Sequence, residues 1–335
     1  MTEETVIARR EGRLGWLLMN RPRALNALDQ AMIEALVAAL DGWRDDPAVA
    51  AVVLDSTSDR AFCAGGDIRA IRTAALAGDG ATIERFFTAE YALNAAIAEY
   101  PKPYVALIDG ICMGGGIGVS VHGTMRVTTE RGLFAMPETA IGMFPDVGAT
   151  FVLPRLHGAL GMFLGLTGTR LAGGDAVHAG LATHFVPAAA LPALRAALVE
   201  QGAAAVSRHA VPPPPFTLAP HLSMIARCFS AGSVAEILTR LAAEPGEAAR
   251  DTLATLRGLS PAALCWSHAA LTRGAGLDLR TALTKELALT RHVTRHPDFA
   301  EGVRAMVVDK DRAPRWTPAT VEQVDAGAIA AMLDG

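Results

Sequence analysis

Segments with the patterns of strands and helices alternate along residues 5 to 129. Two apolar runs on either side of a turn at residues 10 to 13 predict a β-hairpin over residues 5 to 19. Asp29 is a good N-cap, and the apolar side chains that follow it, from Ile33 to Trp43, recur at helical spacing. The alternation continues with strands at 50–54, 104–108 and 125–129, and with helices at 83–99 and from the turn at 114–118. Such repetition predicts an α/β fold with much parallel pairing, whose sites lie in loops at strand ends.

The second part of the chain has a different character. Composition shifts after about residue 190, and the prolines of the segment 211–215 can continue neither a helix nor a central strand. Helical spacing then returns over residues 233–243, 247–257, 260–272 and 278–293. We therefore predict a core over residues 1–190 and a mostly helical C-terminal region over residues 191–335, with a semi-rigid connector at 211–215.

Charge and composition exclude several classes of protein. The net charge is −4 and the basic residues are scattered, so no patch suited to nucleic acid is expected. The start, MTEETVIARREG, lacks the cationic and apolar parts of a secretory signal. No apolar run reaches the roughly 20 residues that cross a bilayer. We expect no membrane association and a cytoplasmic location.

Metal and thiol chemistry find little support. The four cysteines form no CxxC pair and have no histidine at metal-ligand spacing. Buried packing is the simpler interpretation of Cys63 and Cys112. His292 and His296 are four residues apart, but no HExxH motif surrounds them, and a solvated helix end explains them better. No metal and no cofactor are expected.

Two glycine-rich segments follow predicted strands. FCAGGDI (62–68) and GICMGGGIG (110–118) would let backbone amides approach a ligand without an intervening Cβ, and the second opens a helix whose N-terminus favours an anion. Tight turns and close helix packing explain a single such cluster better than a binding site does, but the occurrence of two together weakens that explanation. A dinucleotide fingerprint fails because Val119 stands where the third glycine belongs, and a nucleophile elbow at Ser120 fails because His122 replaces its last glycine.

Two carboxylates lie in the apolar segment FAMPETAIGMFPDVGA (134–149). An ionised carboxylate among apolar side chains needs a partner, a substrate or a raised pKa. Glu138 follows a proline in a poor place for a surface carboxylate, so a site role is expected. Asp146 has two interpretations, either the cap of a helix beginning at Val147 or a member of an acid/base or nucleophilic site.

Together these motifs resemble the crotonase (enoyl-CoA hydratase/isomerase) superfamily. FCAGGDI, GICMGGGIG and MPETAIGMFPDVG occur in the order and spacing of that family, and the likeness covers nearly the whole chain. It includes NRPRALNA (20–27), EYALN (90–94), KPYVALIDG (102–110) and HPDFAEGVRAMVVDKDRAPRW (296–316). The resemblance implies a spiral of ββα turns followed by a helical C-terminal region, and an acyl-CoA substrate.

The resemblance also implies roles for single residues. Gly66 and Gly115 match the two oxyanion-hole donors, Glu138 the catalytic glutamate, Asp146 the aspartate of the thioester-hydrolysing branch, and Glu90 a substrate-contacting glutamate of that branch. Gly115, Glu138 and Asp146 are expected to contact substrate as well. Gly118 stands where hydratases carry a second catalytic glutamate.

The implied reaction is hydrolysis of a 3-hydroxyacyl-CoA thioester, with 3-hydroxyisobutyryl-CoA, an intermediate of valine catabolism, as the expected substrate. The alternatives are an enoyl-CoA hydratase or isomerase that uses Glu138 alone, and a non-catalytic acyl-CoA-binding protein. Self-association through the C-terminal helices is a further expectation, since superfamily members often associate in this way.

Overall fold

The computed structural model describes residues 4–334 and divides them into two compact units. The first unit contains residues up to Asp67 together with Ala89–Ala135 and Arg170–Thr217. The second contains Ile68–Thr88, Met136–Thr169 and Leu218 onward. Both units contain residues from before and after position 190. The division into a core over residues 1–190 and a C-terminal region over residues 191–335 therefore stays a prediction, made from the change in composition.

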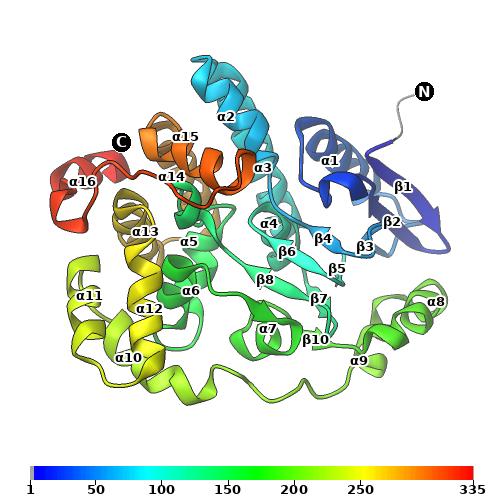
Figure 1. Cartoon of the computed structure of the whole chain (residues 1–335). Coiled ribbons are helices and arrows are strands. Elements are labelled where there is room, and N and C mark those ends of the chain that lie inside the picture. The colour runs from blue at the N-terminus through cyan, green and yellow to red at the C-terminus, as the bar shows by residue number, and fades with distance from the viewer. Residues whose placement is uncertain (1–3, 335) are drawn as a thin grey trace. The chain divides into compact units, whose positions relative to one another are not determined.

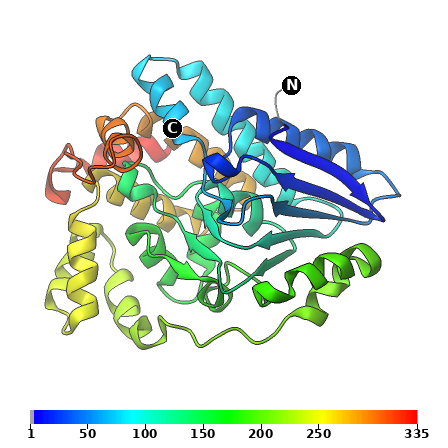
Figure 2. The ribbon, with the colours of Figure 1, turned by 45° about the vertical axis from the view of Figure 1, so that its right-hand side comes forward.

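The first unit contains two β-sheets. A six-stranded sheet has the order β1-β2-β3-β5-β7-β10, and all its neighbours are parallel except the hairpin β1–β2, drawn in dark blue in Figure 2. Its strands are Val6–Glu11, Leu14–Met19, Ala51–Ser56, Tyr104–Ile108, Met125–Thr128 and His184–Phe185. A four-stranded sheet has the order β4-β6-β8-β9 and is parallel except for its last pair. Its strands are Ala61–Cys63, Ile111–Met113, Leu133–Ala135 and Leu171–Ala172.

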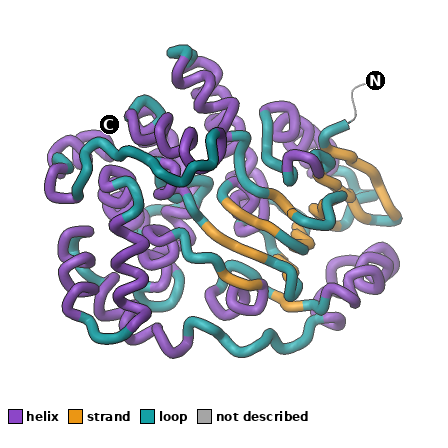
Figure 3. The backbone as a smooth tube through the Cα atoms, in the orientation of Figure 1, coloured by secondary structure: helices purple, strands orange, loops and turns teal. Residues whose placement is uncertain are grey.

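Consecutive strands enter the two sheets in turn, which produces a spiral. β3, β5 and β7 belong to the larger sheet, and the strands that directly follow them, β4, β6 and β8, belong to the smaller one (Figure 3). The chain turns between β5 and β6 at Gly110, whose φ is +109°. A Cβ there would lie 2.5 Å from the carbonyl oxygen of Arg60, so only glycine fits this turn. The predicted repetition is therefore a ββα repetition.

Helices cover the sheets of the first unit. Leu14, Trp16, Val53, Val105 and Val127 belong to one hydrophobic cluster with side chains of α8 (Leu191–Gln201) and α9 (Ala205–His209). Helix α1 (Gln30–Arg44) contacts β1 and β2, α4 (Gly115–Val121) contacts β4 and β6, and α7 (Gly173–Ala179) contacts β10 (Figure 1). Helix α3 (Gly80–Ala98) ends in this unit.

The second unit is helical. Helix α13 (Pro261–Gly274) contacts α5 (Ala149–Val152), α6 (Leu160–Thr167) and α16 (Ala326–Asp334). The remaining helices are α2 (Ile68–Leu76), α10 (Leu222–Phe229), α11 (Val234–Ala243), α12 (Glu247–Arg257), α14 (Leu279–Val293) and α15 (Pro297–Val303). The four C-terminal helices expected from periodicity are confirmed as α11 to α14.

The N-terminal elements are also confirmed. The hairpin lies at β1–β2, and α1 begins after Asp29, whose side chain accepts a hydrogen bond from the Met32 amide at 2.8 Å. The expected strands and helices match β3, β5, β7, α3 and α4 within a few residues. Within residues 4–334, no helix is long and apolar enough to cross a membrane.

Candidate functional site

The two glycine-rich segments end at the same edge of the smaller sheet. Gly66 follows β4 and Gly115 follows β6, and these two strands are parallel neighbours. The carboxyl ends of parallel neighbours lie together, which brings both turns to one place. A Cβ on Gly115 would lie 3.2 Å from the Gly66 nitrogen. The structure therefore brings the two backbone amides expected from the sequence close together.

The backbone around both glycines directs their amides. Leu28 donates to the Gly65 carbonyl at 2.8 Å and accepts from the Asp67 amide at 2.8 Å, in a parallel bridge centred on Gly66. In such a bridge the central residue turns its own N–H to the opposite side. Gly115 is the first residue of α4, where N–H groups have no partner within the helix. It follows Gly114, whose φ of 49° and ψ of −120° suit only glycine.

Glu90 lies beside these amides. It comes from α3 and is 2% exposed, and its Oε1 atom would lie 2.5 Å from a Cβ on Gly115. The same carboxylate contributes to the raised pKa of Cys63, which burial chiefly raises, to about 12. Asn94, one helical turn further along α3, is fully buried. Gly66, Gly115 and Glu90 thus form one polar cluster within the first unit.

Glu138 belongs to the second unit. It begins a 3-10 turn, Glu138–Ile141, and is 7% exposed. Its carbonyl accepts the Met143 amide at 2.9 Å, and the hydroxyl of Thr139 donates to the Leu166 carbonyl at 3.0 Å. At the end of the turn, a Cβ on Gly142 would lie 2.3 Å from the Asp298 carbonyl. The catalytic glutamate expected from the sequence is therefore buried on a tightly packed turn.

Asp146 lies in the same unit and is 5% exposed. The interpretation of Asp146 as a helix cap is wrong. Helix α5 begins at Ala149, and its N-cap is Gly148. Val147 and Gly148 both have positive φ, 53° and 84°, so the backbone leaves the helical path directly after Asp146. The Ala149 amide donates to the Asp146 carbonyl at 2.8 Å, which closes a β-turn.

Glu286 is a buried carboxyl beside this turn that the sequence motifs do not predict. This residue of α14 is 2% exposed and accepts hydrogen bonds from the amides of Gly148 and Thr150 at 2.7 and 3.0 Å. Burial, with a further contribution from the charge of Asp146, raises its pKa to about 8, although the hydrogen bonds oppose that shift. A signal was present, because Glu286 lies at helical spacing within a stripe of buried residues that includes Leu283 and Leu289.

The rival nucleophile and the rival metal site are not supported. The Ser120 hydroxyl bonds within α4 to the Gly116 carbonyl at 2.8 Å, as expected of an ordinary helix residue. Helix α14 ends at Val293, and His296 instead caps α15. No group of three or more metal-ligating side chains lies together in the described part of the chain.

The chain belongs to the enoyl-CoA hydratase/isomerase family, whose model matches residues 14–333. This confirms the predicted superfamily and its α/β fold. The chain is 44% identical to the mitochondrial 3-hydroxyisobutyryl-CoA hydrolase of Xenopus tropicalis over 97% of its own length and 88% of that protein. It is 42% identical to the human protein of the same name over 96% of its length and 86% of that protein.

Two solved structures have closely similar folds. A structure described as a carnitinyl-CoA dehydratase from Mycobacterium thermoresistibile has a TM-score of 0.95 and 39% identity, covering 99% of this chain and 96% of that one. A structure described as an enoyl-CoA hydratase from Rhodobacter sphaeroides has a TM-score of 0.92 and 42% identity, covering 98% and 97%.

The comparisons contradict the expected cytoplasmic location. The relatives from Xenopus tropicalis, Gallus gallus and human are all named as mitochondrial proteins. The expectation rested on the lack of a secretory signal and of a membrane-spanning run, and neither feature distinguishes the cytosol from the inside of an organelle.

Proposed function

We propose that this protein hydrolyses 3-hydroxyisobutyryl-CoA to 3-hydroxyisobutyrate and free CoA. The observation that carries the proposal is 42–44% identity to 3-hydroxyisobutyryl-CoA hydrolases over nearly the whole chain. The buried polar groups described above agree with this chemistry. In the reaction, a water oxygen joins the carbonyl carbon, the C–S bond breaks, and CoA leaves as a thiol.

The amides of Gly66 and Gly115 would bind the oxygen of the thioester carbonyl. This oxygen becomes negatively charged as the carbonyl carbon is attacked, and two fixed N–H donors stabilise that charge without reorganisation. The proximity of the two amides supports this role. Glu90, beside Gly115, would accept a hydrogen bond from a hydroxyl of the substrate.

Glu138 would act at the carbonyl carbon and Asp146 would orient the substrate hydroxyl or the attacking water. Both carboxylates are buried in the second unit, on the segment that resembles the catalytic segment of the superfamily. Glu138 has two routes, direct attack to form a mixed anhydride or removal of a proton from water. Hydroxylamine added during turnover distinguishes them, since only an anhydride yields a hydroxamate on the peptide that contains Glu138.

Two conservative variants test the assignment. Glu138→Gln and Asp146→Asn keep the shape of each side chain, and each should lower thiol release by about 10²- to 10⁴-fold, as expected for a lost acid/base group. The measurement is the rate of free thiol from 3-hydroxyisobutyryl-CoA, with circular dichroism as the test of folding. Near-normal turnover in both folded variants would remove these residues from the mechanism.

An enoyl-CoA hydratase or isomerase is the second candidate, because two solved structures with 39–42% identity are described as a dehydratase and a hydratase. Gly118, buried in α4, argues against hydration, since it stands where hydratases carry their second glutamate. Loss of enoyl absorbance from crotonyl-CoA, measured beside thiol release, decides between them. A protein that binds CoA tightly and turns over no thioester would instead be a binding protein.

The remaining expectations concern partners. Acyl-CoA is the proposed small-molecule partner, with no metal or cofactor needed for hydrolysis by amides and carboxylates. Self-association through the C-terminal helices stays a prediction, which light scattering coupled to size-exclusion chromatography tests.

A further inference from the structure

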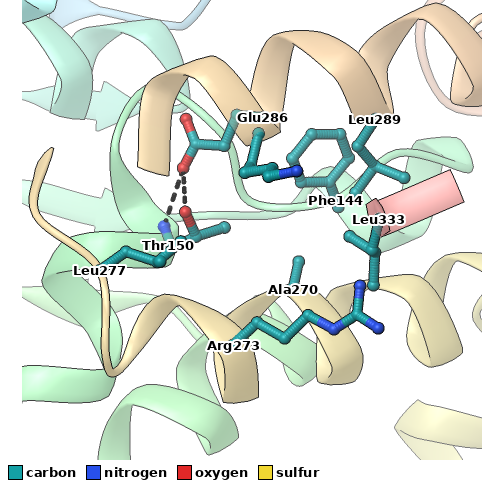
Figure 4. A pocket seen from close by; sticks show the side chains of 9 residues that line it. Phe144, Thr150, Ala270, Arg273, Leu277, Glu286, Leu289 and Leu333 are labelled. Atoms are coloured by element: carbon teal, nitrogen blue, oxygen red, sulfur yellow. Dashed lines mark hydrogen bonds between the residues drawn. The ribbon is translucent and has the colours of Figure 1, made fainter. Parts of the chain in front are cut away.

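Glu286 binds the turn that follows Asp146 through both of its carboxylate oxygens. Oε2 accepts the Gly148 amide at 2.7 Å, and Oε1 accepts the Thr150 amide at 3.0 Å and the Thr150 hydroxyl at 2.5 Å. Figure 4 shows the glutamate of α14 directed at Thr150, with dashed lines to its amide and hydroxyl. A single side chain from another helix thus binds one residue of the turn, Gly148, and the second residue of α5, Thr150.

The turn that Glu286 holds is strained. Residues Asp146 to Ala149 form a β-turn in which both central residues have positive φ, as in the type I′ geometry. The first central residue is Val147, and a β-branched residue in this region costs on the order of 1–3 kcal/mol. Such a conformation persists only where surrounding contacts impose it. The hydrogen bond from Gly148 to Glu286 is a contact of this kind within the turn, and the two from Thr150 hold the residue next to it.

Capping of α5 alone does not explain this glutamate. Helix α5 has only four residues. A serine or aspartate at its N-cap position would satisfy its first amides without the burial of a glutamate from another helix. Glu286 is instead a buried carboxyl whose pKa burial raises to about 8, near the charge of Asp146. Two cationic side chains, Arg273 of α13 and Lys285 of α14, line the adjoining cavity of about 340 Å³. Glu286 therefore binds the start of α5 at the edge of a cavity that also has two cationic side chains.

We propose that Glu286 is a positioning residue, which holds the backbone after Asp146 and so fixes the direction of the Asp146 carboxylate during catalysis. The inference rests on the proposed role of Asp146. Glu286 itself touches the turn and takes no part in bond making. The carboxyl of Glu286 also interacts with the charge of Asp146, so its ionisation enters the pH profile of the reaction.

Glu286→Gln tests the proposal. The amide oxygen can still accept from Thr150, but the NH₂ group faces the Gly148 N–H, so donor meets donor and the turn loosens. Misplacement of a catalytic group by about 1 Å costs up to about 100-fold in rate. We expect kcat to fall by tens of fold, KM to change by less than about threefold, and the alkaline limb of the kcat profile to shift.

A double-mutant cycle shows whether Glu286 acts through Asp146. Once Asp146→Asn has removed the carboxylate, Glu286→Gln should lower the residual thiol release no further. Asp175→Asn is the matched control, because Asp175 likewise accepts the amide and the hydroxyl of one threonine, Thr217, at 2.8 and 2.6 Å. It should lower stability, leave kcat unchanged and combine additively with Asp146→Asn.

The possible outcomes separate the two proposals. If Asp146→Asn is nearly fully active, the role of Asp146 fails and the inference fails with it. If Asp146→Asn is impaired and the effects of the two substitutions multiply, only the inference is overturned. Should Glu286→Gln not fold, Thr150→Val takes its place in the cycle. It removes one hydrogen bond and should give a loss of a few fold that disappears on the Asp146→Asn background.

Discussion

Replacing Gly115 by alanine is the sharpest test of the paired amides. The added Cβ would lie 2.5 Å from Oε1 of Glu90, 3.1 Å from Cδ1 of Leu28 and 3.2 Å from the nitrogen of Gly66. All three neighbours are in the first unit, and both Leu28 and Glu90 are buried. The Gly66 backbone is also tied to Leu28 by a bridge. Because none of these groups can withdraw freely, the start of α4 or the Gly66 turn must move.

This movement should lower both kcat, because it displaces an amide donor, and the free energy of unfolding, because the site becomes overpacked. Losing one oxyanion donor costs about 3 to 4 kcal/mol in the transition state, or about 10²- to 10³-fold in kcat. Overpacking adds a stability loss of about 1–3 kcal/mol. Thiol release from 3-hydroxyisobutyryl-CoA gives kcat, and urea unfolding gives the loss of stability, so the two effects are measured separately.

A matched glycine-to-alanine change provides the control. Gly42 lies within α1 and has no atom within 4 Å of its Cβ position. Gly42→Ala should therefore raise stability by up to about 1 kcal/mol through helix propensity and leave kcat unchanged. A folded Gly115→Ala protein with kcat within about threefold of the wild type would contradict this prediction, because it would show that the Gly115 amide is not needed as a donor.

Three further predictions concern titration and rival residues. The folded pKa of Glu286, about 8, exceeds its ordinary value of 4.5, so the folded protein keeps a proton that the unfolded chain loses. This contribution to stability is complete below pH 4.5 and is lost as the pH rises towards 8, by about 1 kcal/mol per pH unit. Urea unfolding at several pH values should show this slope, and Glu286→Gln should flatten it. Burial raises the thiol pKa of Cys63 and Cys112, so iodoacetamide should label them only after unfolding, and labelling at native rates contradicts their burial. Ser120→Ala should keep kcat within about twofold, whereas a large loss with the fold intact would restore Ser120 as a nucleophile.

The elements that sequence predicts well are those in which local pattern and packing agree. Helix α1 has both a side-chain cap at Asp29 and a regular apolar stripe, and the C-terminal helices α11 to α14 have the same regularity. The strands of the larger sheet could be predicted from the sequence because buried strands are continuous apolar runs. Those of the smaller sheet could not, since β4, β6 and β8 have three residues each, too few for any period to appear.

The sequence predicts both glycine-rich turns, but the structure changes which strands come directly before them. The sequence placed them after the strands at 50–54 and 104–108, whereas the strands directly before them are β4 and β6 of the smaller sheet. Their proximity depends on the pairing of β4 with β6, which is a long-range contact. A local pattern predicts a turn, but only strand pairing determines which two turns meet.

Asp146 shows how a long-range contact changes the meaning of a residue. The side chain of an aspartate cap at this position would have accepted hydrogen bonds from the backbone amides at the start of α5. In the structure the amides of Gly148 and Thr150 donate to Glu286, which lies more than a hundred residues later in the chain. The start of α5 is therefore satisfied by Glu286, and capping no longer accounts for the buried carboxylate of Asp146. The residue that removes the capping interpretation is also the one that we propose positions Asp146.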